Sequence, residues 1–162
     1  MGIFEAEIFL HQMPVTASNF IDMVVSGLYK KRPINRDNPS YIECTGIESI
    51  SDGEFRNLKT GDVEFRWNGG QILNEFTCEY SNKRGTLSKD TKNLPNTDGS
   101  QFFINVIHNR FMDWFSPRDP REIPFHGHVV FGQITNGDDI FESIAVAPIY
   151  GAMMIISITM RM

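Results

Sequence analysis

The stretch NTDGSQFFINV (residues 96–106) begins with turn-forming residues and ends with the aromatic and branched residues that are typical of a strand. Gln101 stands at this change, directly before Phe102 and Phe103. Because successive side chains of a strand point to opposite faces, Gln101 and Phe103 should share one face and Phe102 should lie on the other. We expect Phe102 to pack in the core.

Outward from this stretch, the sequence predicts many strands and two helices. Apolar residues spaced three and four apart predict helices over 14–26, which Pro14 opens, and over 137–145. Residues 29–68 look like short strands joined by long loops. Alternating or branched and aromatic residues predict further strands at 4–10, 85–88, 101–107, 128–134 and 153–160. This combination favours a closed or nearly closed antiparallel barrel with helices covering its ends.

Composition predicts one globular domain over residues 1–162. The formal charge of −5 argues against a nucleic-acid partner, since phosphates call for clustered basic residues. The one basic cluster, Lys30-Lys31-Arg32, is expected in a solvated loop. No apolar run reaches the ~18 residues of a membrane span. Only Cys44 and Cys78 are present, at no regular spacing, so we expect a cytoplasmic protein without a disulfide framework.

Metal or nucleophilic chemistry has little support in the sequence. His126 and His128 could share a face of a strand, but no third ligand is placed beside them, and no metal is expected. Cys44 has no paired base at a recognisable spacing, which favours a small pocket or core residue over a nucleophile.

Four segments together resemble the cyclophilins, the peptidyl-prolyl cis–trans isomerases that bind cyclosporin. They occur in the order found in that family and read FEAEIFL (4–10), MPVTASNF (13–20), PNTDGSQFFINV (95–106) and HVVFGQI (128–134). The resemblance implies a closed antiparallel eight-stranded barrel capped by two helices. It also places Met1 and Gly2 in the first hairpin turn, so that the family's first strand is expected to be missing.

The chemistry that the resemblance implies is rotation about an X-Pro peptide bond, which has a barrier of about 18–20 kcal/mol. This reaction needs no cofactor and no nucleophile. In the family the Arg of F-H-R-x-I-P-x-F-M-x-Q acts on the twisted amide, and residues 34–44 read INRDNPSYIEC. Arg36 is therefore the expected catalytic residue, with Tyr41 and Ile42 as walls of the proline pocket. Cys44 takes the position of the Gln that orients the Arg.

The remaining site residues follow from two more segments. In GTLSKDTKNLPNTDGSQFF (85–103), Lys89, Asp90 and Thr91 replace the family's Met, Ala and Asn, and the last two positions normally contact the substrate backbone. Gln101 is expected to hydrogen-bond the peptide and Phe103 to floor the proline pocket. Farther along the chain, the resemblance aligns three more residues with the family's Trp, Leu and pocket His, namely Phe111, Met112 and His128.

Residues 114–127 form an insertion, so Trp114, Pro124 and Phe125 have no assigned place. Because Phe111 cannot donate the indole N–H, cyclosporin should bind weakly.

Three functions fit this sequence. The leading one is an isomerase of X-Pro bonds in peptides and unfolded proteins, which would assist protein folding. Cys44, Asp90 and Thr91 favour instead a catalytically weak or inactive module that binds proline-containing peptides or acts as a scaffold. A purely structural barrel whose exposed edge pairs with a neighbour is a third possibility.

Overall fold

The computed structural model describes residues 2–29, 32–35, 39–44, 54–57, 59–65, 71–91, 96–117, 127–146 and 153–154. In chain order the elements are β1 (Glu5–Ile8), α1 (Pro14–Val25), β2 (Arg32–Asn35), β3 (Tyr41–Cys44), β4 (Glu54–Arg56), β5 (Val63–Phe65), β6 (Thr86–Lys89), β7 (Phe102–Asn105), a 3₁₀ helix (Arg110–Met112), β8 (Val130–Asn136), α2 (Asp138–Val146) and β9 (Met153–Met154). The predicted mainly-β class with two helices is confirmed.

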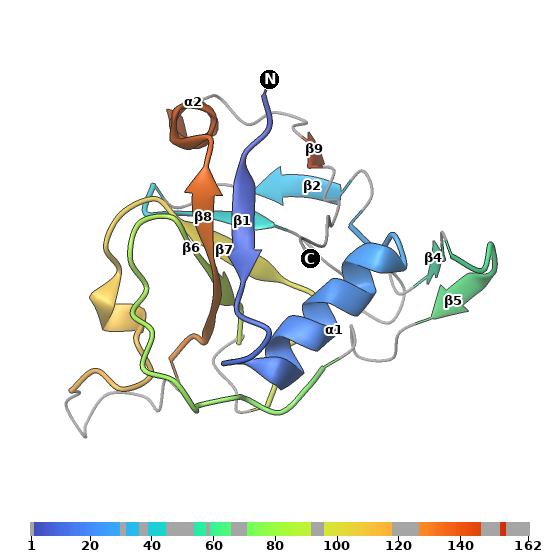
Figure 1. Cartoon of the computed structure of the whole chain (residues 1–162), viewed down its shortest axis with the longest axis horizontal. Coiled ribbons are helices and arrows are strands. Elements are labelled where there is room, and N and C mark those ends of the chain that lie inside the picture. The colour runs from blue at the N-terminus through green and yellow to red at the C-terminus, as the bar shows by residue number, and fades with distance from the viewer. Residues whose placement is uncertain are drawn as a thin grey trace.

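Seven strands form one sheet in the order β1-β8-β6-β7-β3-β2-β9, and every pair of neighbours is antiparallel. Strands β4 and β5 form a separate hairpin to one side of this sheet (Figure 1). Among the strands that the structure describes, no pairing joins the two ends of the order. The antiparallel sheet is therefore established, whereas its closure as an eight-stranded barrel is not.

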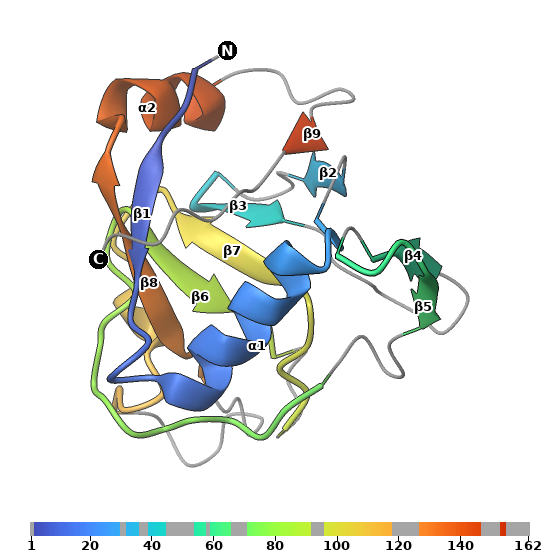
Figure 2. The same cartoon turned by 45° about the vertical axis from the view of Figure 1, so that its right-hand side comes forward.

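Helix α1 lies across the lower part of the sheet, and α2 lies at the upper end of β1 and β8 (Figure 2). The Glu75 carboxylate accepts hydrogen bonds from the backbone N–H groups of Val15 (3.2 Å) and Thr16 (2.8 Å), which satisfies donors of the first helical turn. At the other end, Gly27 has a φ of 84°, a left-handed conformation that suits a helix exit. The predicted helix over 14–26 is thus confirmed.

The hydrophobic core lies between α1 and the sheet. Phe20 of α1 packs edge-on against Phe102 of β7 at a ring-centroid distance of 5.3 Å, and its ring is tilted against that of Phe131 of β8 at 5.0 Å. Phe102 is almost fully buried, as its alternation with Phe103 predicts. The buried face of the helix includes Met23, whereas Ile21 is only partly buried.

The remaining expected elements are found with bounds that are shifted or shortened by a few residues. The strand predicted at 4–10 ends at Ile8, and Leu10 lies in the following turn. The helix predicted at 137–145 is α2, whose first turn carries two aspartates and whose Phe141 is buried. Of the strand predicted at 153–160, only Met153–Met154 lies within the described residues. Neither described helix is long and apolar enough to cross a membrane.

Candidate functional site

Three aromatic rings from three parts of the chain meet on the face of β7 opposite the core cluster, where Phe103 and His128 are both buried. The ring of Phe103 lies 5.1 Å from that of Tyr41 on β3 and 5.0 Å from the imidazole of His128, which precedes β8. The imidazole meets the phenylalanine ring at 89°. We call Tyr41, Phe103 and His128 the ring cluster. Because Phe102 occupies the opposite face of the strand, the ring cluster lies on the side of the sheet away from the core.

Backbone contacts fix the position of His128. Its Nδ1 lies 2.8 Å from the carbonyl oxygen of Lys89, and because a carbonyl only accepts, Nδ1 carries the hydrogen of this bond. The backbone N–H of His128 donates to the Met112 carbonyl at 2.9 Å. Gly127, directly before it, has a φ of 75°, and a Cβ there would come within 2.2 Å of the Trp114 Cα. Glycine therefore lets the 114 segment approach closely enough for His128 to join the ring cluster.

Gln101 follows a turn whose carbonyl groups are held from inside the molecule. The Lys89 ammonium donates to the Gly99 carbonyl at 2.7 Å, and the Tyr29 hydroxyl donates to the Ser100 carbonyl at 2.5 Å. The Gln101 carbonyl accepts from the backbone N–H of Asp90 at 3.3 Å. Alternation along the strand then places the Gln101 side chain on the face of Phe103.

A buried network of hydrogen-bonded polar side chains lies next to the ring cluster. Asp113, next to Met112, accepts from the Ser81 hydroxyl (2.6 Å), from the Asn82 backbone N–H (2.7 Å) and from the Asn82 amide (2.9 Å). The Asn82 oxygen accepts in turn from Ser88 at 2.7 Å, and Asn105 donates to Ser88 at 3.1 Å. Ser88 pairs directly with Phe103 across β6 and β7, so the network adjoins the ring cluster on the same face of the sheet.

Comparison with known proteins decides the family. A family model for the cyclophilin type peptidyl-prolyl cis-trans isomerase/CLD matches residues 1–160. This chain belongs to that family. The cyclophilins are enzymes, so the resemblance found in the four sequence segments is confirmed together with the enzyme class that it implies.

Two isomerases and one solved cyclophilin structure are among the proteins that this chain resembles. A peptidyl-prolyl cis-trans isomerase of Acinetobacter baylyi is 29% identical over 148 residues, which cover 91% of this chain and 69% of that protein. Peptidyl-prolyl cis-trans isomerase A of Dickeya dadantii is 30% identical over 132 residues, which cover 82% of this chain and 60% of that protein. A crystal structure of a Cryptosporidium parvum cyclophilin in the presence of the dipeptide Ala-Pro matches with a TM-score of 0.62 at 23% identity, over 90% of this chain and 80% of that one.

Several of the residues expected from the cyclophilin pattern lie together. Tyr41, Phe103 and His128 form the ring cluster, and Gln101 shares the face of Phe103. Met112 is buried and joined to His128 through its carbonyl.

Ile42 and Cys44 face the core instead of the ring cluster. This corrects the prediction of Ile42 as a wall of the proline pocket, and it agrees with the core alternative expected for Cys44 rather than with substrate contact. Ile42 pairs with Ile104 and Cys44 pairs with Phe102, and all four side chains belong to the core cluster. The physical reason is the two-residue period of a strand, because Tyr41 and its neighbour Ile42 cannot face the same side. Burial, and secondarily the Glu43 carboxylate, raises the pKa of the Cys44 thiol far above its ordinary value. The buried surroundings therefore favour the protonated thiol over the reactive thiolate.

The other predicted residues differ in exposure. Thr91 is fully buried, so its side chain does not face solvent, and its carbonyl accepts from the Thr97 hydroxyl. Asp90 is half-buried, and Phe111, on the 3₁₀ helix, is 67% exposed.

Arg36 and His126 lie outside the described residues. Strand β2 ends at Asn35, directly before the arginine. Among the described side chains, no group of three His, Cys, Asp or Glu residues could hold a metal ion.

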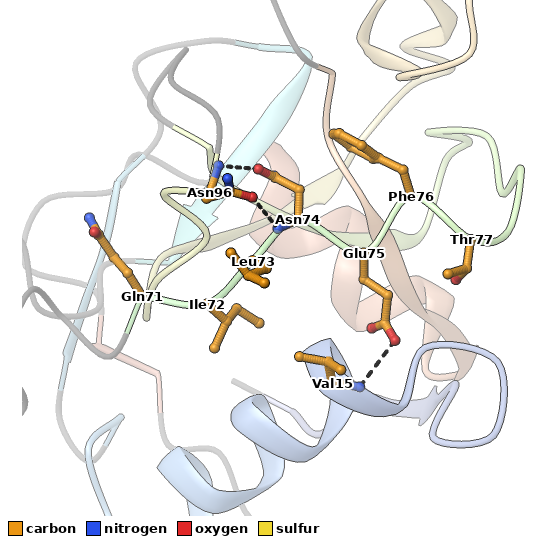
Figure 3. A pocket seen from close by; sticks show the side chains of 9 residues that line it. All are labelled: Val15, Gln71, Ile72, Leu73, Asn74, Glu75, Phe76, Thr77 and Asn96. Carbon is orange, nitrogen blue, oxygen red and sulfur yellow. Dashed lines mark hydrogen bonds between the residues drawn. The ribbon is translucent and has the colours of Figure 1, made fainter.

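A separate cavity of about 930 Å³ opens between the start of α1 and residues 71–77 (Figure 3). Asn74 and Asn96 hydrogen-bond each other's backbone N–H groups at its edge, and Val15 contributes an apolar wall. None of the residues predicted from the sequence lines it. Ile72, in its wall, forms a bridge with Asp98, so the cavity adjoins the turn that precedes Gln101.

Sequence reasoning missed Lys89, Ser88 and Asn105. Lys89 was noted only as a departure from the family pattern, yet its carbonyl holds His128 and its ammonium holds Gly99. The alternation of the strand could have found Ser88 on the face of the site, since it lies one residue from Lys89, which faces the core.

Proposed function

We propose that this cyclophilin catalyses cis–trans isomerisation of X-Pro bonds in peptides and unfolded proteins, with the proline ring bound on the ring cluster. The observation that carries the proposal is the meeting of Tyr41, Phe103 and His128 on the face of β7 that also carries Gln101. The three rings form an apolar surface against which a proline ring can pack. The Gln101 amide has both a donor and an acceptor for a peptide backbone.

Catalysis would come from electrostatic stabilisation of the twisted amide. In that state conjugation is lost and the prolyl nitrogen becomes basic, so a fixed donor that binds it better than either planar isomer lowers the barrier. Arg36 supplies such a donor, because guanidinium keeps its charge at every physiological pH. No proton transfer and no covalent intermediate is needed, which agrees with the protonated, core-facing Cys44. Gln101 would hold the peptide while the bond turns.

Replacing Arg36 with Ala tests this function. Exchange NMR on a Suc-Ala-Ala-Pro-Phe-type peptide should show rapid cis–trans exchange with the wild-type protein and a loss of roughly 10²-fold in the variant, the magnitude typical of removing one electrostatic donor. Arg84→Ala is the matched control, because that arginine pairs with Glu142 at 2.8 Å on α2 and should leave exchange unchanged. Background-level exchange in the wild type, with the peptide still bound, would instead identify a non-catalytic binding module.

Weak cyclosporin binding is a second expected result. Phe111 is largely exposed and has no N–H to donate, while the ring of Trp114 stacks on Phe76 at 5.1 Å with its indole nitrogen buried. Trp114 therefore does not supply the missing donor. Calorimetry should give a dissociation constant well above the nanomolar range, and Phe111→Trp should tighten it. Nanomolar binding by the wild type would contradict the assignment of Phe111.

The complete fold and the location are also proposals. Family membership supports closure of the sheet as an eight-stranded barrel capped by α1 and α2, within a single domain over residues 1–162. A cytoplasmic location is supported by Cys44 and Cys78, both of which are free thiols.

A further inference from the structure

Lys89 is a charged residue in a place where charges are rare. It pairs with Phe102 across β6 and β7, so its side chain points into the core, and none of its surface is exposed. The ammonium lies 6.0 Å from the ring centre of Phe20 and 5.5 Å from that of Phe131. Burial of an ammonium in such surroundings is costly, and it is tolerated where the charge has partners.

The partners of the ammonium belong to the turn before Gln101. Its one hydrogen bond within the described residues goes to the Gly99 carbonyl, at 2.7 Å. Asp98, the preceding residue, is fully buried as well, and the two charges influence each other. Burial lowers the pKa of Lys89 to about 8 while Asp98 opposes the shift. Burial raises the pKa of Asp98 to about 6, opposed by Lys89 and Asn74 and reinforced by the Asp90 carboxylate.

Two consecutive carbonyl groups are therefore anchored from the core, directly before the residue that the site needs. Lys89 holds Gly99, and Tyr29 holds Ser100 at 2.5 Å. An anchored carbonyl fixes the orientation of its peptide plane, and the next peptide plane starts from it. The backbone entering Gln101 is thus set by two buried side chains, one of which is an ion that water cannot replace in a packed core.

We infer that Lys89 is a positioning residue, which fixes Gln101 against a bound X-Pro peptide by holding the Gly99 carbonyl from inside the core. This inference rests on the proposed isomerase function. Lys89 touches no substrate itself. Its side chain spans the core from β6 to the turn at residues 98–100, and its carbonyl also holds His128, so one residue connects two parts of the site.

A double-variant cycle with Gln101 tests the inference. Lys89→Met keeps a long unbranched side chain and removes the donor, and it should lower kcat/KM roughly 10-fold through looser placement of the amide. In a Gln101→Ala background the same substitution should change kcat/KM less than about 2-fold, because nothing remains to be positioned. Lys83→Met is the matched control, since Lys83 is an exposed lysine near the start of β6 and should have no effect.

A spectroscopic readout separates positioning from loss of fold. In ¹⁵N-labelled protein, Lys89→Met should shift or broaden the side-chain amide signals of Gln101, while well-dispersed backbone amide signals show that the fold is retained. Tyr29→Phe, which removes the donor to Ser100, should disturb the same signals. Unchanged Gln101 signals in Lys89→Met, or equal effects of this substitution with and without Gln101, would overturn the inference. Absence of activity in the wild type would refute the proposed function alone, since the amide signals would still report on the positioning.

Discussion

Replacing Asp113 with Ala is expected to lower the free energy of unfolding by about 4 kcal/mol, the range found when a buried, hydrogen-bonded charge loses its place in a network. Asp113 is almost fully buried and accepts three hydrogen bonds, from Ser81 and twice from Asn82. Alanine would leave the backbone N–H of Asn82 without its acceptor in the interior, which is the largest part of the cost. Urea unfolding, compared at matched m-values, measures the change.

Two further variants test whether the loss of stability is specific to the hydrogen bonds of Asp113. Asp113→Asn keeps an acceptor for Asn82, and the Ser81 hydroxyl can reverse its bond, so we expect roughly half of the loss. Glu79→Ala removes an exposed carboxylate of the same segment and should stay within about 0.5 kcal/mol. A loss below about 1 kcal/mol in Asp113→Ala would show that the network does not contribute as its geometry indicates.

The double substitution of Lys89 by Met and Asp98 by Asn is expected to raise the free energy of unfolding by about 3 kcal/mol near pH 7, because apolar replacement of buried ion pairs is often stabilising. Burial lowers the pKa of Lys89 from 10.5 to about 8 although Asp98 opposes the shift, so the folded protein disfavours the charged ammonium. The folded protein likewise disfavours the charged carboxylate of Asp98, since its pKa rises from 3.8 to about 6. The two effects are partly shared and do not add.

The increase in unfolding free energy of the double variant should depend on pH in a way that the two pKa shifts determine. For Asp98 the folded pKa is raised, so wild-type stability recovers as the pH falls from about 6 towards 3.8. For Lys89 the folded pKa is lowered, so wild-type stability recovers as the pH rises from about 8 towards 10.5. The difference in unfolding free energy between the double variant and the wild type should therefore be largest between about pH 6 and 8. A difference in unfolding free energy that stays constant from pH 4 to 10 would contradict the shifted pKa values of Lys89 and Asp98.

The single variants complete the measurement. Asp98→Asn leaves the Lys89 ammonium buried without its carboxylate, and the double variant should exceed the sum of the singles by about 1–3 kcal/mol. The stabilised protein should also be the poorer isomerase if Lys89 positions Gln101. A charge retained at a cost in stability is what a functional role for it would require.

The sequence predicted the helices and the strand of Gln101 well, because local patterns decide them. Proline at the start, glycine at the exit and an apolar stripe specify α1 with little help from the rest of the chain. Alternation likewise placed Phe102 in the core. These features depend on residues within a few positions of one another, which is the range over which sequence periodicity is informative.

The predicted site differs from the structure where the position of a side chain depends on which face of the sheet it occupies. Matching residues to a family pattern assigned both Tyr41 and Ile42 to one pocket, although neighbours on a strand face opposite sides. The role of Lys89 could not be predicted from its position in the chain, because its partner Gly99 lies across the core on another segment. Long-range pairing, which determines both cases, is not contained in a local pattern.

The place of β8 in the sheet has a consequence for synthesis of the chain. Ile8 of β1 pairs with Gly132 of β8, so β1 meets this partner only after all the residues between them have been synthesised. At about 5–20 residues per second, a ribosome needs on the order of 10 s to make the residues between them. During that time β1 has no β8 to pair with, and the sheet order cannot be completed. Folding of this sheet therefore cannot be completed before β8 has been synthesised, and until then the backbone N–H and C=O groups of β1 have no partners on that strand.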